Sequence, residues 1–283
     1  MTEKGYRVLQ HIVTHLNKTV IALVVGAPDE HLTNDYFAEI QALCTQENIP
    51  FQPRTTSRSV LPRYALAVSW RWLITDVHSL IVLHDSLLPR YRGFAPLVSC
   101  LLNGEPEIGV TALYATAEFD RGPVLAQAAR PVQYPITIAG AIDLTVACYL
   151  ELVTRLWPGL CAGALPPGTP QLESAATYSL WRDEEDYRID WGRDSTYLRR
   201  FVDALGPPYR GASTLLGGQR HRVLAAEAEP DVVIENRAPG KVLFVRAGQP
   251  VVVCGTGLLR LTALRTDAGG DALPLRQFRS RFG

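Results

Sequence analysis

The sequence predicts an α/β protein with a larger, doubly wound Rossmann-like domain and a smaller β-rich domain behind it. In the first half of the 283-residue chain, segments with apolar residues at helical spacing alternate with short apolar runs, the pattern of parallel strands joined by crossover helices. A cluster of Pro and Gly at residues 157–170 ends this pattern. Beyond it, short apolar runs separated by Gly and Pro are typical of a small β-barrel-like domain.

The elements of the first half follow from the spacing of apolar residues. Residues 5–16 and 34–46 carry apolar side chains three and four positions apart, which predicts two helices. Short apolar runs that predict strands or extended segments occur at residues 20–26, 49–51, 64–68, 79–83 and 109–114. Strands that alternate with helices in this way imply a parallel sheet with crossover helices.

The beginning of the chain departs from this plan. A doubly wound sheet usually opens with a strand that comes to lie near its middle, whereas this sequence opens directly on the predicted helix at residues 5–16. We therefore expect either that the sequence starts late or that the fold lacks its first strand.

We divide the chain at the Pro- and Gly-rich cluster. The predicted parts are a doubly wound domain at residues 1–160, a linker at 161–177 and the smaller domain at 178–283. Within the last part, helical spacing predicts one helix at residues 195–205. Apolar runs that predict strands lie at residues 221–225, 240–245, 251–253 and 258–263.

The charge and composition of the chain argue against several classes of protein. Lys and Arg equal Asp and Glu at 28 each, so there is no overall positive field to hold a nucleic acid. No apolar run reaches the roughly 18–20 residues that a membrane span needs. The five cysteines form no CxxC pair, which indicates reduced thiols rather than disulfides or a zinc site. We therefore predict a cytoplasmic protein without a metal.

A histidine at the end of a predicted strand is the first candidate for chemistry. His84 follows the run at residues 79–83, and ligands of open α/β sheets bind at the carboxyl ends of strands. Asp120 follows the run at residues 109–114, in a turn closed by Gly122. Because a carboxylate orients an imidazole and stabilises its charged form, we predict that His84 and Asp120 form a general acid–base pair.

The residues around this pair resemble a known family. The run HDSLLPRYRGFAP begins at His84, and the run NGEPEIGVTALYATAEFDRGPVLAQ contains Asp120. Both are similar to the signature of enzymes that use 10-formyltetrahydrofolate to formylate amines. The segments TYSLWR, RIDW and LGPPYRGA resemble the opening of the C-terminal domain in the enzymes that act on methionyl-tRNA and on nucleotide-linked amino sugars. The resemblance implies a Rossmann-like formyltransferase domain followed by an OB-like β-barrel domain.

The resemblance also implies a mechanism in which an amine attacks the formyl carbon and the enzyme stabilises the resulting oxyanion. In the family this is done by the histidine, by the aspartate of the DxG turn and by an asparagine two residues before the histidine. The counterparts here are His84, Asp120 and Val82. A valine cannot donate a hydrogen bond, and the loss of one oxyanion donor typically costs about 2.7–4 kcal/mol in the barrier. Three interpretations remain open: Ser86 or a loop amide replaces the asparagine, His84 acts alone, or formyl transfer has been lost or replaced.

Further contacts for the folate and for the amine follow from the same resemblance. The predicted folate-binding residues follow two strands and are Ser69, Trp70, Arg71, Trp72, Ser86, Leu87, Leu88 and Pro89. The predicted substrate contacts are Asp85, Arg90 and Arg92. Structural roles compete with these, because tryptophans also fill cores and interfaces and arginines also occupy solvated loops.

Three hypotheses for the function result. The first is transfer of a formyl group from 10-formyltetrahydrofolate to a small-molecule primary amine, above all a nucleotide-linked amino sugar. The second is formylation of methionyl-tRNA, which requires clustered basic residues, whereas the arginines of the second domain are scattered. The third is a formyltransferase-fold protein with a binding role or other acyl chemistry, motivated by Val82. No membrane partner is expected, and a homodimer is compatible with the sequence.

Overall fold

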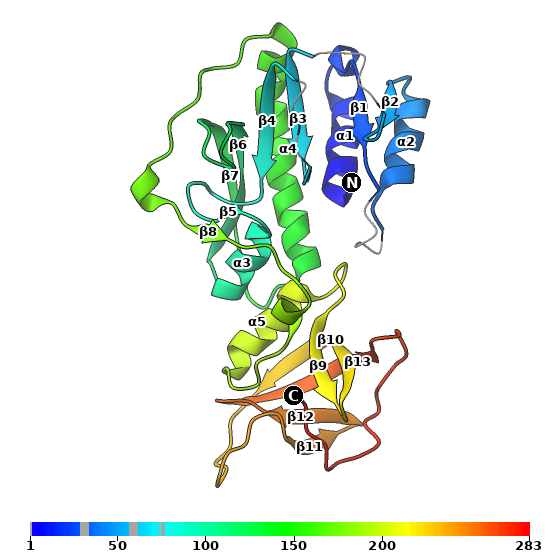
Figure 1. Ribbon diagram of the computed structural model, residues 1–283, viewed down its shortest axis with the longest axis vertical. Helices are drawn as coiled ribbons and strands as arrows, with labels where there is room; N and C mark the ends of the chain where they lie inside the picture. The colour runs from blue at the N-terminus through cyan, green and yellow to red at the C-terminus, as the bar shows by residue number, and fades with distance from the viewer. Residues whose placement is uncertain (1, 29–33, 57–61, 73, 75–76) are drawn as a thin grey trace. The chain divides into compact units, whose positions relative to one another are not determined.

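The structure is a computed structural model that describes residues 2–28, 34–56, 62–72, 74 and 77–283 (Figure 1). The chain divides into two compact units. The first comprises Met1–Leu97, Pro106–Val132 and Ala141–Leu180, and the second comprises Val98–Glu105, Gln133–Gly140 and Trp181–Gly283. No pattern in the sequence indicates that the two short segments at residues 98–105 and 133–140 group with the second unit.

The first part of the chain contains alternating helices and strands, as the sequence predicts, and it also contains helices and strands that no predicted segment covers. In chain order they are α1 (Glu3–His15), the 3-10 helix η1 (Lys18–Val20), β1 (Val24–Gly26), α2 (Phe37–Gln46), β2 (Phe51–Pro53), β3 (Tyr64–Val68), β4 (Ser79–His84), β5 (Arg92–Gly93), α3 (Pro96–Asn103), β6 (Glu107–Tyr114), β7 (Val124–Pro131) and α4 (Ile138–Ala162).

The sheets of the first unit are mixed rather than wholly parallel. The larger sheet has the strand order β3-β4-β6-β7, and β1 pairs separately with β2. The β1–β2 and β3–β4 pairs are parallel, as expected, whereas β6 is antiparallel to both β4 and β7. The expectation of a parallel sheet is therefore corrected for β6 and β7. The short connection at residues 115–123 joins these two strands, and a connection of this length without a crossover helix joins antiparallel strands.

Helix α1 is the helix predicted at residues 5–16. It begins after Thr2, whose hydroxyl accepts a hydrogen bond from the amide of Gly5. Its buried face carries Val8, Leu9 and Ile12, at the spacing that the sequence indicates. The strand predicted at residues 20–26 is shorter than expected, because the side chain of Asn17 accepts a hydrogen bond from the amide of Thr19 and starts η1.

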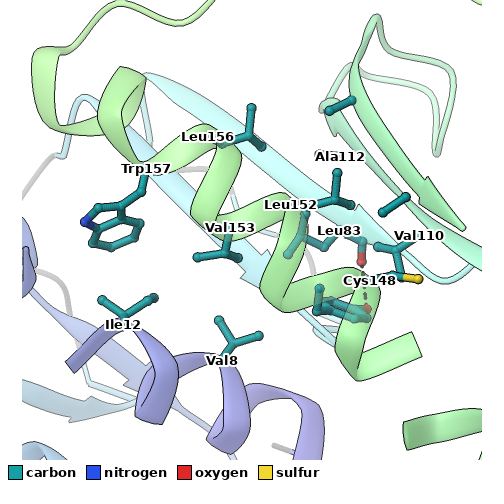
Figure 2. Packing of buried hydrophobic residues seen from close by; sticks show 13 residues of the cluster. Val8, Ile12, Leu83, Val110, Ala112, Cys148, Leu152, Val153, Leu156 and Trp157 are labelled. Carbon is teal, nitrogen blue, oxygen red and sulfur yellow. Dashed lines mark hydrogen bonds between the residues drawn. The ribbon is translucent and has the colours of Figure 1, made fainter. Parts of the chain in front are cut away.

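The main core of the first unit lies between α1, α4 and the larger sheet (Figure 2). Figure 2 shows Val8 and Ile12 of α1 on the side of α4 that carries Val153 and Trp157. Burying a valine or leucine side chain completely contributes about 1.5–3 kcal/mol to folding. The other buried members are Leu83, Val110, Ala112, Ala126, Ala128, Cys148, Tyr149, Leu152 and Leu156.

The Pro- and Gly-rich cluster at residues 157–170 is only partly a linker. Helix α4 continues to Ala162 and contains Pro158. The chain then forms a 3-10 helix, η2 (Glu173–Ala175), and the short strand β8 (Tyr178–Ser179), which pairs with β5 in parallel. Through these contacts, the segment up to Leu180 belongs to the first compact unit.

The second unit contains a five-stranded antiparallel sheet. Its elements are the 3-10 helix η3 (Glu185–Tyr187), α5 (Ser195–Leu205), β9 (Ala212–Leu216), β10 (Gln219–Glu229), β11 (Val242–Arg246), β12 (Gln249–Val253) and β13 (Leu258–Thr266). The strand order is β11-β12-β13-β10-β9. Helix α5 coincides with the prediction, and Asp194 caps it by accepting a hydrogen bond from the amide of Tyr197 at 2.8 Å. The four predicted apolar runs lie in or overlap β10 to β13, whereas β9 was not predicted.

The last residues of the chain reach both edges of this sheet. The amide of Phe282 donates to the carbonyl of Gly240, just before β11, at 2.8 Å. The amide of Gly283 donates to the carbonyl of Leu215, in β9, at 2.9 Å. These bonds satisfy backbone groups that an open sheet would leave unpaired at its edges.

All five cysteines are free thiols, of which Cys161 is exposed and the others are buried. Burial raises the pKa of Cys44 to about 11 and that of Cys254 to about 12. Among the residues that the structure describes, no helix is both long and apolar enough to cross a membrane.

Candidate active site

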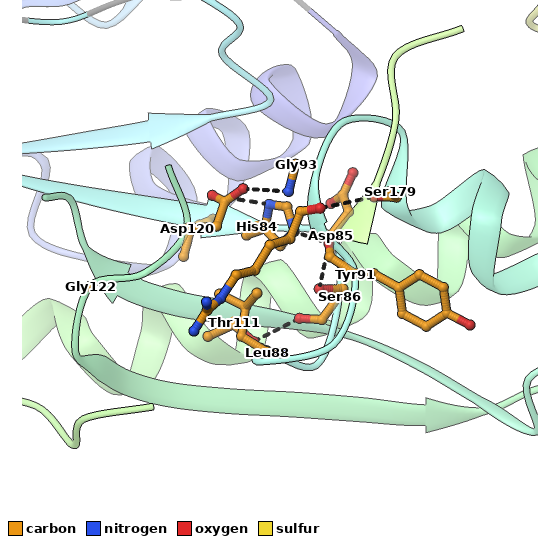
Figure 3. A network of polar contacts seen from close by, with 12 residues as sticks. His84, Asp85, Ser86, Leu88, Tyr91, Gly93, Thr111, Asp120, Gly122 and Ser179 are labelled. Atoms are coloured by element: carbon orange, nitrogen blue, oxygen red, sulfur yellow. Dashed lines mark hydrogen bonds and ion pairs between the residues drawn. The ribbon is translucent and has the colours of Figure 1, made fainter. Parts of the chain in front are cut away.

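His84 lies at the carboxyl end of β4 and is buried, with 8% of its side chain exposed. Its Nε2 lies 2.8 Å from the carbonyl oxygen of Tyr91. Its Nδ1 lies 3.4 Å from the carboxylate of Asp120 (Figure 3). Because a carbonyl oxygen only accepts hydrogen bonds, Nε2 carries a hydrogen and Nδ1 is the nitrogen that can exchange a proton with the carboxylate. The two predicted catalytic residues are therefore neighbours in the fold.

Asp120 is held in place by its turn. Its backbone is left-handed, with a φ of 57°, a conformation that aspartate adopts more readily than most residues. One carboxylate oxygen accepts a hydrogen bond from the amide of Gly93 at 2.8 Å. The turn also requires Gly122, since a Cβ atom there would lie 1.7 Å from the carbonyl oxygen of Tyr114. Asp120 thus faces His84 in a fixed orientation.

Asp85, a predicted substrate contact, is engaged inside the protein. Its carboxylate lies 2.5 Å from the Nζ of Lys4 and accepts a hydrogen bond from the hydroxyl of Tyr149 at 2.6 Å. Burial by itself raises the pKa of Asp85, but the charge and hydrogen bond of Lys4 and the bond from Tyr149 bring it below its ordinary value. Burial and the neighbouring carboxylate raise the pKa of Tyr149. The sequence does not indicate that Lys4 contacts Asp85, because Lys4 lies far along the chain from the motif that begins at His84.

The loop after His84 is held by its own polar groups and by side chains of β6 and β7. The hydroxyl of Ser86 is buried and donates to the carbonyl of Arg90 at 2.7 Å. Thr111 of β6 donates to the carbonyl of Ser86 at 2.7 Å and accepts from the amide of Leu88 at 3.0 Å. Gln127 donates to the carbonyl of Leu88 and to Thr111. Sequence reasoning missed Thr111, although a polar residue inside an apolar run must find a partner when buried.

Val82 lies within β4, between Ala67 of β3 and Leu113 of β6. Residues two apart on a strand face the same side, so Val82 shares a face with His84 but offers no donor. Among the alternative donors that the sequence suggests, the Ser86 hydroxyl already donates to Arg90, and the Ser86 amide donates to the carbonyl of His84. His84 is engaged in the same way, since its Nε2 donates to the carbonyl of Tyr91, so each of these donors must exchange a protein acceptor before it can meet a developing oxyanion.

The two predicted substrate arginines differ in their surroundings. Arg90 is exposed, and its guanidinium lies 5.1 Å from the centre of the Tyr91 ring. Arg92 has 1% of its surface exposed. Its guanidinium lies 2.9 Å from both carboxylate oxygens of Glu173 and 2.9 Å from the side-chain oxygen of Gln171. Arg92 therefore binds the segment that follows α4.

The predicted folate contacts after β3 lie in a separate group. Ser69 hydrogen-bonds Tyr149, which links it to Asp85. The rings of Trp70 and Trp72 pack edge to face with centres 5.0 Å apart, and Arg71 lies over Trp72. A cavity of about 660 Å³ in the first unit is lined by Trp70 but not by His84 or Asp120. Within the described residues, no group of three or more His, Cys, Asp or Glu side chains could hold a metal ion.

Comparisons with known proteins bear on the chemistry of this pair. A family model described as formyl transferase matches residues 51–139, which include His84 and Asp120, and a model of the formyl transferase C-terminal domain matches residues 182–283. The methionyl-tRNA formyltransferase of Dechloromonas aromatica is 31% identical over 243 residues, which are 81% of this chain and 76% of that protein. The chain belongs to the formyltransferase family. It contains both formyltransferase domains.

Other members of the formyltransferase family extend the comparison. The methionyl-tRNA formyltransferase of Ralstonia nicotianae is 34% identical over 219 residues, or 77% of this chain, which spans 66% of the length of that relative. The N-formyltransferase of Helicobacter canadensis, crystallised with folinic acid and dTDP-3-aminofucose, superposes with a TM-score of 0.71 over 92% of this chain and 96% of that one. At 12% identity, this match shows that the formyltransferase fold is shared.

Proposed function

We propose that this formyltransferase transfers a formyl group from 10-formyltetrahydrofolate to a primary amine. The observation that carries the proposal is the His84–Asp120 contact of 3.4 Å at the end of β4. A bound formyl-folate supplies a carbonyl carbon that an amine can attack. For His84 to donate to the oxygen of that carbonyl, its Nε2–H must exchange the carbonyl of Tyr91 for the substrate. Asp120 orients the imidazole through Nδ1, and the pair accepts the amine proton and returns it to the folate nitrogen as the bond from that nitrogen to the formyl carbon breaks and tetrahydrofolate leaves. These two side chains have the chemistry that formyl transfer requires.

The absence of a donor at Val82 makes His84 the central residue of this proposal. The loop amide of Leu88, the hydroxyl of Ser86 and the Nε2–H of His84 all donate to protein oxygens. Donation by His84 alone is supported by its place beside the carboxylate of Asp120, a neighbour that neither loop donor is shown to have. Loss of one oxyanion donor typically slows a reaction by about 10²–10³. We therefore propose an enzyme that retains formyl transfer at a reduced rate. In this proposal the folate is contacted through backbone or ring surfaces by Ser69, Trp70, Arg71, Trp72, Ser86, Leu87, Leu88 and Pro89.

We propose a small amine, such as a nucleotide-linked amino sugar, as the acceptor. The distribution of charge in the second unit supports this choice. Arg222 is buried and paired with Glu184 and Asp267, and Arg199 pairs with Asp203. These arginines are therefore neutralised within the unit and contribute little to a surface that would release counterions from an acceptor stem. Exposed Arg90 is the candidate for a substrate phosphate.

Formylation of methionyl-tRNA is the second candidate. It is favoured by one observation, the names of the relatives that are 31–34% identical to this chain.

We further propose that the sheet of the second unit closes as an OB-like barrel, supported by the bonds from residues 282 and 283 to the two edges. The free thiols fit a reducing compartment such as the cytoplasm.

A single-turnover formylation assay tests the proposal. Wild type, His84→Ala and Val82→Asn are each mixed with 10-formyltetrahydrofolate and either a nucleotide-linked amino sugar or methionyl-tRNA. We expect wild-type activity with the sugar, a loss of at least about 10² on His84→Ala, and a gain on Val82→Asn. Activity with the tRNA alone selects the second candidate. Activity that arises only in Val82→Asn identifies a protein that has lost formyl transfer and serves a binding role or other acyl chemistry.

A further inference from the structure

The segment after α4 contacts the turn that carries Asp120. One residue of this segment, Gln171, is half-buried, and its side-chain amide donates to the backbone carbonyl of Asp120 at 2.7 Å and to that of Gly122 at 2.8 Å. The side-chain oxygen of Gln171 accepts from the guanidinium of Arg92, at 3.2 Å from Nε and 2.9 Å from Nη2. Gln171 therefore joins the Asp120 turn to a buried arginine of β5.

The chemistry of these partners fixes the orientation of the Gln171 amide. A guanidinium only donates hydrogen bonds and a backbone carbonyl only accepts them. The side-chain oxygen of Gln171 must therefore face Arg92, and its nitrogen must face the turn. The two hydrogens on that nitrogen are both used by the turn, one for each carbonyl. The substitution Gln171→Glu would keep the acceptor for Arg92 and remove both donors to the turn.

The turn that Gln171 binds has a backbone conformation that needs support. Asp120 has a φ of 57°, and a residue other than glycine keeps a left-handed backbone only where the surrounding contacts hold it. The donors of Gln171 fall on the carbonyl of Asp120 itself and on the carbonyl two residues later. They restrain the backbone that directs the Asp120 carboxylate toward His84, while the carboxylate accepts from the amide of Gly93 (Figure 3).

The same segment also holds the second contact of His84. The Nε2 of His84 lies 2.8 Å from the carbonyl of Tyr91, and the amide of Tyr91 donates to the hydroxyl of Thr177 at 2.9 Å. Thr177 lies six positions after Gln171, in the same segment. The segment after α4 thus holds the protein groups on both sides of the imidazole.

We propose that Gln171 is a positioning residue for formyl transfer, whose amide holds the Asp120 turn so that the carboxylate stays within reach of Nδ1 of His84. This role rests on the proposed function, because it concerns the proton that the His84–Asp120 pair transfers. Gln171 acts through Asp120 and needs no contact with the folate or the amine. Restraint of this kind matters, since a misplacement of about 1 Å can slow a reaction by about 10².

Amide hydrogen exchange in the absence of substrates tests whether Gln171 holds the turn. The amide of Gly93 is the reporter, because it donates to the carboxylate of Asp120 at 2.8 Å. We expect Gln171→Glu to speed exchange of the Gly93 amide at least roughly tenfold, since the turn opens more often once its carbonyls lose their donors. The matched control is Gln41→Glu, the same substitution at an exposed position on α2, which should leave this exchange unchanged.

A second amide shows whether the segment after α4 is still docked in the variant. The amide of Phe94 donates to the carbonyl of Ser179 at 3.1 Å, so it reports on the β5–β8 contact rather than on the turn. Because Gln171→Glu keeps an acceptor for Arg92, we expect the Phe94 amide to exchange as in the wild type.

A double-mutant cycle tests whether Gln171 acts on the reaction through Asp120. With an amine that the wild type formylates, we expect Gln171→Glu to lower kcat by about 10–10² and to leave the KM for 10-formyltetrahydrofolate unchanged. In a protein that already carries Asp120→Asn, Gln171→Glu should lower kcat no further, because residues that act as one unit are not additive. Gln41→Glu should keep the wild-type kcat.

The outcomes separate this role from its alternatives. Unchanged exchange at Gly93 in Gln171→Glu overturns the proposal, and so do losses of kcat that add to those of Asp120→Asn. Equal acceleration at Gly93 and Phe94 also overturns it, because Gln171 then docks the whole segment rather than the turn. If the wild type formylates no amine, the proposed function fails, and the exchange rates alone then decide whether Gln171 holds the turn.

Discussion

The carboxylate of Asp85 lies 2.5 Å from the ammonium nitrogen of Lys4, although 81 positions separate the two residues. Lys4 belongs to α1, and Asp85 directly follows His84 at the end of β4. The hydroxyl of Tyr149, from α4, completes the contact. The ion pair thereby anchors the loop that carries His84 to two helices.

The first prediction concerns the strength of this anchor. The side chains of Lys4 and Asp85 are 9% and 20% exposed, and removing one partner of a buried ion pair typically costs about 3–5 kcal/mol. We expect Asp85→Asn to lower the free energy of unfolding by about 3 kcal/mol, measured by urea denaturation at pH 7. Asp143→Asn is the control, because Asp143 forms a largely exposed ion pair with Arg7 and should change stability by less than about 1 kcal/mol. Equal losses in the two variants would contradict a special role for Asp85.

The second prediction is the pH dependence of the same contact. The folded-state pKa of Asp85 is lowered: burial opposes this, but Lys4 and Tyr149 outweigh burial. A carboxyl of an unfolded chain titrates near 3.9, so the stabilisation is complete above about pH 4 and is lost as the pH falls through the lower folded-state pKa. We expect the stability difference between wild type and Asp85→Asn to stay constant from about pH 5 to 8 and to shrink below about pH 4. If the stability difference between wild type and Asp85→Asn instead grows as the pH falls, the folded-state pKa of Asp85 is raised rather than lowered.

The third prediction separates the charge of Asp120 from its structural contact. Asparagine tolerates the left-handed backbone and can still accept the hydrogen bond from the Gly93 amide, but it cannot take a proton from His84. We expect Asp120→Asn to keep the wild-type melting temperature within a few degrees and to lower kcat by about 10²–10⁴. The comparison is Asp120→Ala, which also removes the acceptor. If Asp120→Asn retains full kcat, Asp120 has a structural role only.

The fourth prediction concerns Arg92, which holds the segment after α4. The amide of Phe94 donates to the carbonyl of Ser179 at 3.1 Å, so its exchange rate reports on the docking of this segment. Lysine cannot reproduce the fork of bonds from Arg92 to Glu173 and Gln171. We expect Arg92→Lys to speed exchange at Phe94 at least roughly tenfold, whereas Arg90→Lys, at an exposed position, should leave it unchanged. Unchanged exchange in both variants would show that β5–β8 pairing holds the segment without Arg92.

The fifth prediction is the reactivity of the cysteines. Cys161 is exposed, and the other four thiols are buried. Burial raises the pKa of Cys44 and Cys148 to about 11 and that of Cys254 to about 12, so little thiolate is present at pH 8. We expect a thiol reagent to label one cysteine of the native protein and all five after denaturation, with Cys161→Ser abolishing the native reaction. Rapid labelling of native Cys161→Ser would show that a buried thiol opens to solvent.

Much of the fold could be predicted from the sequence because its signals are local. The apolar spacing of α1 and α5 and the short runs of β3 and β4 lie within windows of a few residues, which is the range over which periodicity acts. The direction of β6 and β7 could not be read in this way, since strand pairing depends on how the chain turns back. The true end of α4 was also missed, because the Pro158 region looked like a loop by composition.

The sequence by itself determined the family-like motifs, several helices and strands, and the two residues that meet in the candidate site. Because β6 is antiparallel to β4, the carboxyl ends of these strands lie at opposite edges, and it is the turn at residues 115–123 that brings Asp120 to His84. Only the tertiary structure decided what surrounds them. It pairs Asp85 with Lys4 and Arg92 with Glu173, and it places the hydroxyl of Ser86 on a carbonyl of its own loop. The physical reason is that ion pairs, buried hydrogen bonds and sheet edges join residues far apart in the chain. A local sequence pattern therefore does not predict which of these residues come into contact.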